Sequence, residues 1–358
     1  MKILIVKTSA LGDILQCFGV LGYFSRVFPE AEIDWVVEAE YADLLNAHRA
    51  LRRVIPVATR KWRRNPLSRQ TIREWRRFIN QLRREKYDHI FDLQGNVKSA
   101  CVAFFAAGKK KVGFSFSSAA EWPAALVYSE RYKPLREGLR ADHYLSLVEQ
   151  QMNCKVETKR HQLSQIKLAI KCDAVNWIDA IVAPSARSVR LMICMGSRWE
   201  NKRLSVTTWE AFLRLLQREL APFFFFSWGT ETEKKAAVTL QCALKDKAVV
   251  LPRLQLSVWQ HLMEKMDAVI AVDSSALHLA ATTTTPSFGI FGPSLASCYQ
   301  PNRSDRGYFQ GSCPYGEQFP QRCRKLRHCP TGACLKEVTA ATLAGSFFAW
   351  WRALTRTV

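Results

Sequence analysis

The chain has 358 residues, 48% of them hydrophobic and 23% charged, which is typical of a globular protein long enough for two domains. Its 52 Lys and Arg against 31 Asp and Glu give a formal net charge of +21. This excess favours a polyanionic partner: a nucleic acid, an anionic membrane face or a phosphorylated substrate. No apolar run approaches the ~20 residues that a membrane-spanning helix needs, and we expect no signal peptide, because an apolar strand begins at once.

The first half of the sequence alternates short apolar strands with helical patterns. Residues 2–6 (KILIV) predict a buried strand, and a helix follows with apolar side chains on one face from Leu11 to Phe24. Further strands are expected at 32–37, 53–57, 89–93 and 111–114, and further helices at 41–47, 70–86, 143–152 and from the turn at 94–99 to residue 107. This alternation predicts βαβ units and a parallel sheet.

The second half restarts the same pattern after a weakly patterned stretch, 153–188, where we place the domain boundary. Strands are expected at 189–194, 223–228, 248–251, 268–272 and, as the last strand, 287–291. Helices are expected at 207–220 (capped by Thr207 or Thr208), from residue 230, and at 258–266 and 276–281. We therefore predict an α/β protein with two halves whose strand-to-helix turns are directed at a common cleft.

Two segments carry unusual side chains. Residues 60–86 concentrate basic residues around Trp62, Trp75 and Phe78, and within them 70–86 predicts an amphipathic helix with a solvated basic face. The basic turn at 60–64 either contacts an anion or is solvated. The segment 338–352 predicts an amphipathic helix rich in Phe and Trp, which packs onto the body of the protein or touches a membrane surface.

Asp13 stands at the first turn between a strand and a helix. Open α/β sheets place their ligands in such turns, beyond the carboxyl ends of the strands. The position alone favours a structural role, in which Asp13 stabilises the helix start through the helix dipole, and leaves a chemical role open.

The strongest local site in the second half is AVIAVDSSALHLAA (268–281). An apolar strand leads to Asp273, and Ser274 and Ser275 follow at a helix start whose free backbone N–H groups would suit a diphosphate. His278 lies in the first helical turn. The alternatives are simple N-capping by the serines and a buried structural histidine.

Two further loops offer groups for a nucleotide. Gly196 and Ser197 follow a strand, and a glycine there lets a backbone approach a ligand closely. Lys202, on the same loop, either neutralises a phosphate or is solvated. Glu233, after the strand 223–228, suits a ribose diol.

Several function classes lack their motifs. There is no GxGxxG after a strand, no GxxxxGK[ST] and no GxSxG, so a dinucleotide dehydrogenase, a P-loop nucleotidase and a Ser-His-Asp hydrolase have no support. Of the eleven cysteines, Cys17, Cys101, Cys172, Cys194 and Cys242 are expected to be reduced, mostly small core residues. Cys313, Cys323, Cys329 and Cys334 either bind zinc or, as their spacing favours, belong to a reduced structural loop.

Several separate motifs, in order and over most of the chain, resemble glycosyltransferase family 9. They are KILIVKTSALGDILQ (2–16), IDWVVE (33–38), RVIPVATRKWRR (53–64), DLQGNVKSA (92–100) and VDSSALHLAA (272–281). Within the family, lipopolysaccharide heptosyltransferases of type I look nearest, whereas the late CPTGACL pattern looks more like type II. The resemblance implies a GT-B fold with an acceptor domain at 1–170, a nucleotide-sugar domain at 171–330 and a C-terminal helix, 331–358, packed on the N-terminal domain.

The resemblance also implies a reaction: metal-independent, inverting transfer of L-glycero-D-manno-heptose from ADP-heptose to a Kdo residue of Kdo-lipid A, in lipopolysaccharide core synthesis, without a cofactor. It implies a monomer on the cytoplasmic face of the inner membrane, in peripheral contact with anionic lipid and without a nucleic-acid partner. Asp13 would be the general base. The donor would bind at Gly196, Ser197, Lys202, Glu233, Asp273, Ser274, Ser275 and His278. The acceptor would bind at Ser9, Ala10, Gly12, Arg60, Lys61, Arg63, Arg64, Gln94 and Lys98.

Two departures from the family pattern bear on this reading. Ala120 precedes Glu121 where type I enzymes carry an arginine, so one acceptor-binding cation is missing. The phosphate loop reads Gly196-Ser197, with one extra residue before Lys202. The alternatives are a family 9 transferase with another donor or acceptor, and a non-catalytic binder of anionic glycolipid.

Overall fold

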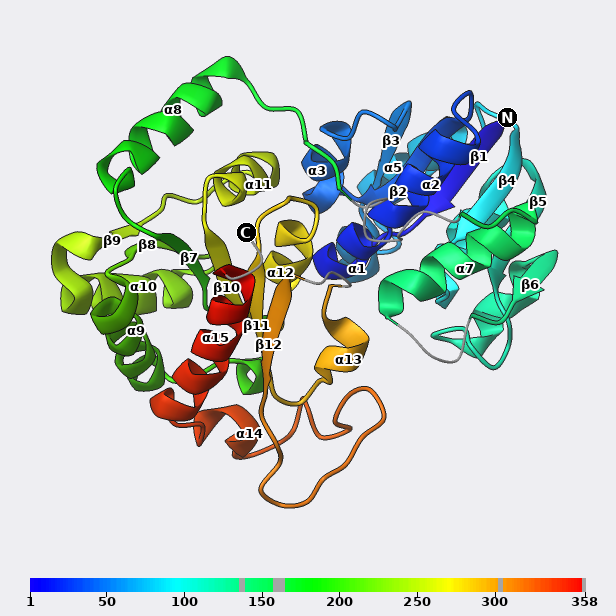
Figure 1. The fold of residues 1–358 in the computed structure, drawn as a ribbon. Helices are drawn as coiled ribbons and strands as arrows, with labels where there is room; N and C mark the ends of the chain where they lie inside the picture. Colours follow the sequence, from blue (N-terminus) through cyan, green and yellow to red (C-terminus); the bar gives the residue numbers. More distant parts are fainter. Residues whose placement is uncertain (135–138, 157–164, 302–304, 356–358) are drawn as a thin grey trace. The chain divides into compact units, whose positions relative to one another are not determined.

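A computed structural model describes residues 1–134, 139–156, 165–301 and 305–355 (Figure 1). The chain divides into two compact units, Met1–Ala169 and Ile170–Val358. Each unit contains a six-stranded sheet in which every strand pairing is parallel. The predicted α/β class is confirmed.

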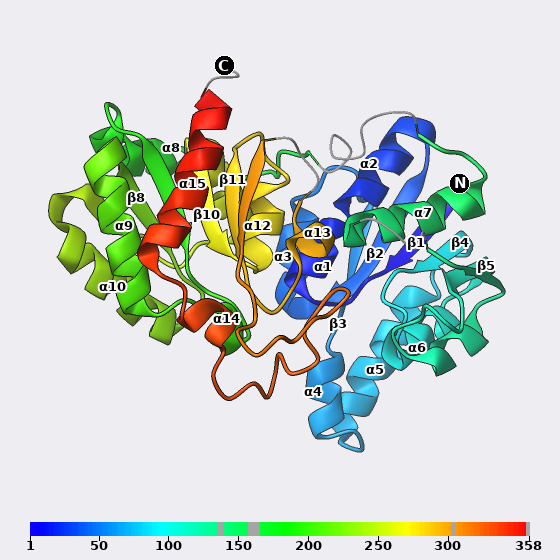
Figure 2. The ribbon, with the colours of Figure 1, turned by 60° about the horizontal axis from the view of Figure 1, so that its bottom comes forward.

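The first sheet has the strand order β3-β2-β1-β4-β5-β6. Its strands are β1 (Lys2–Val6), β2 (Glu32–Glu38), β3 (Arg53–Val57), β4 (Tyr87–Asp92), β5 (Gly108–Phe114) and β6 (Glu130–Tyr132). Its helices are α1 (Leu11–Gln16), α2 (Phe18–Val27), α3 (Ala42–Asn46), α4 (Thr59–Arg64), α5 (Arg69–Leu82), α6 (Val97–Phe105) and α7 (Arg140–Met152), with 3-10 segments η1 (Ala39–Tyr41) and η2 (Trp122–Val127). Helices α2 and α7 cover one face of the sheet, and α5 and α6 cover the other (Figures 1 and 2).

The second sheet has the order β12-β11-β10-β7-β8-β9. Its strands are β7 (Arg190–Cys194), β8 (Phe223–Ser227), β9 (Ala248–Val250), β10 (Ala268–Val272), β11 (Ser287–Phe291) and β12 (Arg306–Gln310). Its helices are α8 (Cys172–Val182), α9 (Val206–Leu220), α10 (Glu231–Leu244), α11 (Leu256–Glu264), α12 (Ser275–Ala280), α13 (Ala296–Tyr299), α14 (Ala333–Lys336) and α15 (Ala340–Thr355), with 3-10 segments η4 (Ala183–Ser185), η5 (Glu200–Lys202) and η6 (Lys245–Lys247).

The central strands are apolar because both of their faces are covered. In β1, Ile3, Leu4, Ile5 and Val6 are all fully buried. Since side chains alternate along a strand, Leu4 and Val6 pack in the cluster with α5 and α6, whereas Ile3 and Ile5 point to the opposite face. A continuous apolar run is therefore the expected signature of this strand.

The two units share one topology. Read from β9 to β12, the second sheet runs through its strands in the same sequential order as the first sheet does from β3 to β6. In each, the direction in which strands are added reverses between two central neighbours, β1 and β4 in one unit and β7 and β10 in the other. Ligands of open α/β sheets bind at this reversal, beyond the carboxyl ends of the strands. We therefore expect ligands to bind at the turns after these four strands.

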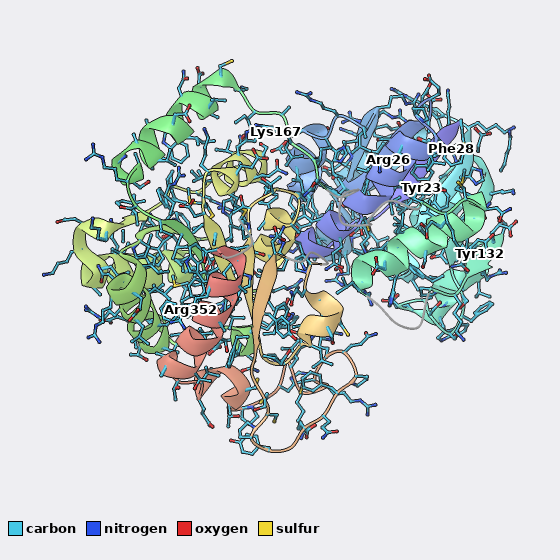
Figure 3. All side chains as sticks on the ribbon, in the orientation of Figure 1. Tyr23, Arg26, Phe28, Tyr132, Lys167 and Arg352 are labelled. Atoms are coloured by element: carbon cyan, nitrogen blue, oxygen red, sulfur yellow. The ribbon has the colours of Figure 1, made fainter. Side chains whose placement is uncertain are left out.

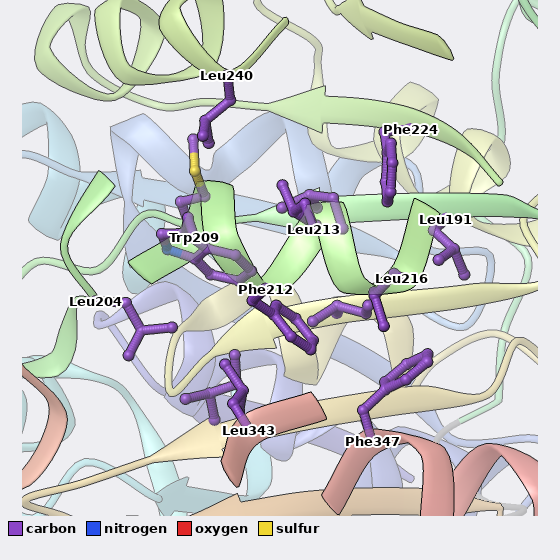
Figure 4. Close-up of a cluster of buried hydrophobic side chains, with 14 of the residues drawn as sticks. Leu191, Leu204, Trp209, Phe212, Leu213, Leu216, Phe224, Leu240, Leu343 and Phe347 are labelled. Atoms are coloured by element: carbon purple, nitrogen blue, oxygen red, sulfur yellow. The ribbon is translucent and has the colours of Figure 1, made fainter. Parts of the chain in front are cut away.

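Helix α15 belongs to the core of the second unit (Figure 2). It packs against α9 and β12, and Phe347 lies fully buried among Phe212, Leu216 and Phe288 (Figure 4). The Trp350 indole N–H donates to the Asp305 carbonyl oxygen at 3.3 Å. This packing differs from the expected docking of the C-terminal helix on the N-terminal domain. Its aromatic side chains fill the second unit's core, which leaves few of them for a membrane surface.

Several local predictions are wrong. Residues 59–64 form a helix rather than a turn, and the expected helix from Leu11 to Phe24 is divided at Cys17 into α1 and α2. The cap of α9 is Ser205, whose hydroxyl accepts from the Thr208 N–H, instead of Thr207 or Thr208. The edge strands β6 and β12 and helix α8 were not predicted, and β12, not β11, is the last strand.

Burial of the cysteines also differs from expectation. Cys17 and Cys194 are buried, but Cys101, Cys172 and Cys242 are exposed on helices. The patterns of the helices predicted around Cys101 and Cys242 did not reveal which face each cysteine occupies, and Cys172 begins α8, which was not predicted. Within the described residues, no helix combines the length and apolar character needed to cross a bilayer.

Candidate active site

Asp13 lies half-buried in the first turn of α1, directly after the turn that leaves β1. Its Oδ2 accepts from the backbone N–H of Ala10, the N-cap residue, at 3.3 Å. Its Oδ1 accepts from the hydroxyl of Tyr144, on α7, at 3.4 Å. Asp13 thus caps the helix start, as its position suggested, and is also held from a second side by a residue distant in sequence.

Tyr144 is connected in turn to Lys7, a buried cation at the end of β1. The Lys7 ammonium group donates to the Tyr144 hydroxyl at 2.9 Å and to the Leu93 carbonyl oxygen at 3.0 Å. Burial alone lowers the pKa of Lys7, but the Tyr144 oxygen and the Asp13 carboxylate outweigh it and raise this pKa overall. Burial raises the pKa of Tyr144, which keeps its hydroxyl protonated and able to donate to Asp13. The three residues form a chain of hydrogen bonds that ends on the Asp13 carboxylate.

The turn after β4 lies against the turn after β1. The Ser9 N–H donates to the Gln94 side-chain oxygen at 3.2 Å, so two of the expected acceptor residues are in direct contact. The fully buried Asp92 carboxylate shapes this turn by accepting from the N–H groups of Gln94 at 2.9 Å and Gly95 at 3.0 Å and from the Tyr128 hydroxyl at 2.7 Å. Burial raises the pKa of Asp92.

Gly95 has a positive φ of 71°, and a Cβ there would press on the Phe114 ring. The turn that presents Gln94 therefore needs a glycine at this position. Ala10 and Gly12, also expected at the acceptor site, flank the start of α1 and are half-buried.

The predicted acceptor cations lie on α4 and at the start of α6. On α4, Arg60 pairs with Glu40, and Lys61 pairs with Glu74 at 2.6 Å. Arg63 and Arg64 are exposed on the same helix, and Lys98 is exposed in the first turn of α6.

Glu38, at the end of β2, connects the two groups of cations. Its carboxylate accepts from Thr59 at the start of α4. Burial raises the pKa of Glu38, against the opposing charges of Arg60 and Lys98. Both Arg60 and Lys98 therefore lie close enough to Glu38 to act on it electrostatically.

In the second unit, Lys202 and Asp273 form an ion pair between the turns after β7 and β10. The Lys202 ammonium nitrogen lies 2.5 Å from Asp273 Oδ2, and both side chains are largely buried, 13% and 8% exposed. The Ser294 hydroxyl, after β11, donates to the same carboxylate oxygen. The Ser197 hydroxyl donates to the Asp273 carbonyl oxygen at 3.1 Å. The structure thus brings Ser197, Lys202 and Asp273 together and adds Ser294, which sequence reasoning missed.

Gly196 lies directly against the Glu233 carboxylate. A Cβ at Gly196 would overlap that carboxylate, so only glycine allows this approach. Glu233 Oε2 accepts from the Gly229 N–H at 2.8 Å, and its Oε1 lies 3.5 Å from an Arg203 guanidinium nitrogen. Arg203 also donates to the Ser197 carbonyl oxygen, 2.7 Å from its Nε. Arg203 was not predicted, although it adjoins Lys202 in sequence.

Of the two serines after Asp273, Ser274 has an ordinary structural role. Ser274 is the N-cap of α12, and its hydroxyl accepts from the Ala276 N–H at 3.4 Å. The Ala276 N–H, one of the backbone groups expected to bind a diphosphate, is therefore already hydrogen-bonded. Ser274 thus has the N-capping role that was the alternative to diphosphate binding. Ser275 and His278 are half-buried on this short helix.

Of the four late cysteines, Cys313, Cys323 and Cys329 lie in the loop before α14, and Cys334 lies in α14 itself. Burial and the neighbouring Cys313, Cys329 and Cys323 raise the pKa of Cys334 to about 11. The Asn201 side-chain amide donates to the carbonyl oxygens of Leu326 at 2.9 Å and Cys329 at 3.1 Å, which fixes the residue beside Lys202. Among the described residues, no group of three or more His, Cys, Asp or Glu side chains is arranged to hold a metal ion.

Comparisons with known proteins identify the family of this chain. The model of glycosyltransferase family 9 (heptosyltransferase) matches residues 75–324. The chain is 33% identical over 296 residues to lipopolysaccharide heptosyltransferase 1 of Pseudomonas aeruginosa, covering 82% of this chain and 79% of that protein. It is 27% identical over 294 residues to lipopolysaccharide heptosyltransferase 1 of Escherichia coli K12, covering 82% and 88%.

A solved structure has the same fold. The E. coli heptosyltransferase WaaC with ADP superposes with a TM-score of 0.79 at 23% identity, covering 98% of this chain and 100% of that chain. The GT-B architecture expected from the sequence motifs is confirmed. Both the matched family model and the extent of the similarity to a curated relative lead to one conclusion: this chain belongs to glycosyltransferase family 9 and is a glycosyltransferase.

Proposed function

We propose that this chain transfers L-glycero-D-manno-heptose from ADP-heptose to a Kdo residue of Kdo-lipid A, with inversion at the anomeric carbon. The heptosyl donor and the lipopolysaccharide pathway are supported by relatives named lipopolysaccharide heptosyltransferase 1. The observation that carries the chemistry is the Asp13 carboxylate, held by Ala10 and Tyr144 beyond the end of β1.

Asp13 is the general base. One carboxylate oxygen accepts the proton of the acceptor hydroxyl while the hydroxyl oxygen forms a bond to the anomeric carbon of the donor. The bond from that carbon to the ADP oxygen breaks on the opposite side, so ADP leaves and the configuration inverts. An aspartate is a weak base at neutral pH, so correct positioning of the acceptor supplies much of the acceleration. The Lys7–Tyr144 chain keeps the carboxylate in one orientation.

Lys202 stabilises the departing diphosphate. Its ammonium group is a point charge of the kind that compensates negative charge developing on a leaving group. Asp273 holds Lys202 through one carboxylate oxygen, and Ser294 holds Asp273. Because a carboxylate repels phosphate, Asp273 acts here by positioning Lys202, not by touching the diphosphate. We infer that Asp273 contributes to the donor site through Lys202 rather than by lining the diphosphate itself.

The nucleoside part of the donor binds at Glu233 and Gly196. The Glu233 carboxylate has the two acceptor oxygens that a ribose diol requires, and the Gly229 N–H and Arg203 fix its orientation. Gly196 contributes by leaving room for that carboxylate. Ser275 and His278 remain candidates for donor contact.

The acidic acceptor binds along the first unit, from Ser9, Gly12 and Gln94 toward Lys98 and α4. Arg63 and Arg64 are exposed, whereas Arg60 and Lys61 are each paired with a glutamate. We therefore expect Arg63, Arg64 and Lys98 to contribute most to binding of the acceptor's anionic groups. The basic segment also supports peripheral contact with the cytoplasmic face of the inner membrane by a monomeric enzyme.

The surroundings of Ala120 favour a second candidate, a family 9 transferase with a different acceptor. Ala120 lies beside the Gln94–Gly95 turn, because its neighbour Glu121 donates its N–H to the Gly95 carbonyl oxygen at 3.0 Å. An arginine in this place would add a cation next to an acceptor residue, and this chain has none there.

A ligand panel tests the proposal. Thermal shifts are measured with ADP-, UDP- and GDP-sugars, followed by transfer assays from the stabilising donor to Kdo-lipid A and to a heptosylated acceptor. Stabilisation by ADP-heptose and release of ADP only with Kdo-lipid A are expected. Turnover only with the heptosylated acceptor supports the second candidate, and binding of glycolipid without any consumption of ADP-heptose contradicts both.

A further inference from the structure

One surface of the first unit joins exposed aromatic side chains to cations on neighbouring elements. We call it the α5–α6 patch. It consists of Trp75, Arg76, Arg83, Phe104, Phe105 and Lys111, which come from α5 and its C-cap, the end of α6 and β5. Phe104 is 58% exposed and Trp75 is 38% exposed. Exposure of one apolar residue is normal, but two exposed rings joined through the half-buried Phe105 form a contiguous aromatic surface, which indicates an interaction surface.

The rings of the patch form a continuous row. The Trp75 and Phe105 ring centroids lie 5.0 Å apart and those of Phe104 and Phe105 lie 5.2 Å apart, both edge to face. The Arg83 Nε–H donates to the Phe105 carbonyl oxygen at 3.0 Å, and the Lys111 ammonium group donates to that of Phe104 at 2.8 Å. The aromatic row is therefore held in place, with a cation fixed at each end of the Phe104–Phe105 pair.

Positive charge is not balanced within the basic segment 60–86, which supplies Trp75, Arg76 and Arg83 to the patch. Residues 60–86 contain eleven Lys and Arg against two Glu. Glu74 is engaged by Lys61, and Glu85 is engaged by Lys2 and Arg52. Burial lowers the pKa of Lys111, and the positive charge of Arg83 lowers it further. An anionic partner would relieve this repulsion, so the patch has the charge complementarity for a negative surface.

The chemistry of the patch distinguishes between anionic partners. Nucleic acids stack their bases on the faces of aromatic rings, but these rings contact one another. Ile72, 41% exposed, and Leu67, 88% exposed, lie on the same basic segment and have nothing to offer a base. Aromatic and aliphatic side chains among arginines instead suit the boundary between lipid headgroups and acyl chains. We propose that the α5–α6 patch docks this chain on an anionic lipid surface.

This proposal rests on the proposed function, because a lipid-linked acceptor is presented at a membrane. Its test is sedimentation of the full chain with phosphatidylcholine vesicles that contain about one-quarter phosphatidylglycerol, or none. Binding is expected only to the anionic vesicles and should weaken as salt rises. Arg76→Gln should weaken binding about fivefold, the effect of one interfacial cation. Phe104→Gln should weaken it about tenfold, because an exposed ring that enters the interface is lost.

Matched controls come from the same unit. Arg26 lies on α2, which covers the opposite face of the sheet (Figure 3), so Arg26→Gln makes the same charge change elsewhere. Phe116 is 48% exposed and has Arg131 above its ring at 5.3 Å, so Phe116→Gln removes a comparable aromatic–cation pair. Both controls should bind anionic vesicles like the unaltered chain. Equal losses in controls and patch variants would show a nonspecific charge effect and overturn the proposal.

Two further measurements complete the test. If the patch variants keep vesicle binding and lose retention on a single-stranded oligonucleotide, the surface is a nucleic-acid surface and the proposal is wrong. Transfer to an acceptor dispersed in detergent should be unchanged in Phe104→Gln. If the patch variants keep full transfer to the detergent-dispersed acceptor and also bind vesicles undiminished, the docking proposal is wrong and the proposed function still stands. Absence of transfer in the unaltered chain contradicts the proposed function, whatever the vesicles show.

Discussion

Lys202 and Asp273 pair at 2.5 Å although they are 71 positions apart in the sequence. They meet because β7 and β10, which precede them, are hydrogen-bonded neighbours at the centre of the second sheet. An ion pair this buried is costly unless its remaining hydrogen-bonding positions are satisfied, and Ser294 supplies one such bond to Asp273. The pair presents a single cation at a fixed place beyond the carboxyl end of the sheet.

Lys202→Ala should weaken ADP binding about 10- to 100-fold, because the charge-assisted contact with the diphosphate is lost. Asp273→Asn should weaken it less, by releasing Lys202. In the Lys202→Ala background, Asp273→Asn should then have almost no further effect, since its target is gone. Calorimetric titration with ADP measures all of these variants.

Lys265→Ala is the control, because Lys265 forms an exposed ion pair with Asp179 in the same unit. It should leave ADP binding unchanged. Additive losses from Lys202→Ala and Asp273→Asn would mean that Asp273 contacts the donor independently, against the positioning role argued above.

Tyr144→Phe should reduce kcat about tenfold and leave the KM for the donor unchanged, because it breaks the chain from Lys7 to Asp13 without removing the ring. Tyr23→Phe is the matched control (Figure 3). Tyr23 is also a fully buried tyrosine of the first unit, and its hydroxyl donates to the Cys154 carbonyl oxygen at 2.9 Å, away from Asp13. Equal kcat in the two variants would remove Tyr144 from the mechanism.

Gly196→Ala should weaken binding of ADP while the fold persists. The new methyl group would displace the end of the Glu233 side chain, which can move at little cost in stability. Gly229→Ala makes the same change where the nearest Glu233 oxygen would lie 3.5 Å away, an ordinary contact. A clear difference in ADP affinity between the two variants, at equal Tm, is expected. No difference would show that Glu233 does not hold the nucleoside.

Asp34→Asn should lower the free energy of unfolding of the first unit by about 2 kcal/mol, because the buried carboxylate loses its charge-assisted hydrogen bonds to two half-buried arginines, Arg52 and Arg53. The Asp34 carboxylate is 0% exposed and accepts from Arg52 at 2.8 Å, Arg53 at 2.7 Å and Tyr87 at 2.6 Å. Burial by itself raises the pKa of Asp34, but these hydrogen bonds outweigh it and lower the pKa overall.

The lowered pKa of Asp34 predicts how the difference in unfolding free energy between the wild type and Asp34→Asn depends on pH. The stabilisation by Asp34 is fully present above the ordinary aspartate pKa of about 4 and disappears as pH falls through the lower folded-state pKa. Urea unfolding at a series of pH values should therefore show wild type and Asp34→Asn converging in acid. Exposed Asp43, replaced by Asn, should show little difference at any pH. A gap for Asp34→Asn that stays constant in acid would contradict the assignment.

Much of the fold was predictable because its strands are buried on both faces. Continuous apolar runs such as residues 2–6 and 268–272 can be identified as strands without knowing which strands they pair with. The turns after these two strands contain Asp13 and Asp273. The edge strands β6 and β12 were missed because they lack such runs; β12, for example, alternates buried residues with the exposed Tyr308. Helix α4 was missed because its sequence is a run of cations without apolar periodicity. The helix buries no side chain, so no such periodicity is needed.

The candidate site was predictable only residue by residue. Lys202 and Asp273 were each identified from their own turns, but their pairing depends on the order of strands in the sheet. Tyr144 gave no local signal, because its contact with Asp13 spans 131 positions. Lys7 stood within the first motif, yet its full burial follows from α7 covering that face of the sheet.

The most direct test of the central claim is the rate of transfer by Asp13→Asn, measured together with its affinity for ADP. If Asp13 is the general base, kcat should fall about 100- to 10,000-fold while ADP affinity stays unchanged. Asp43→Asn, which removes a carboxylate from the first turn of α3, controls for the loss of charge at a helix start and should keep its activity. Turnover by Asp13→Asn within a factor of about two of the unaltered enzyme would contradict the assignment of Asp13 as the base.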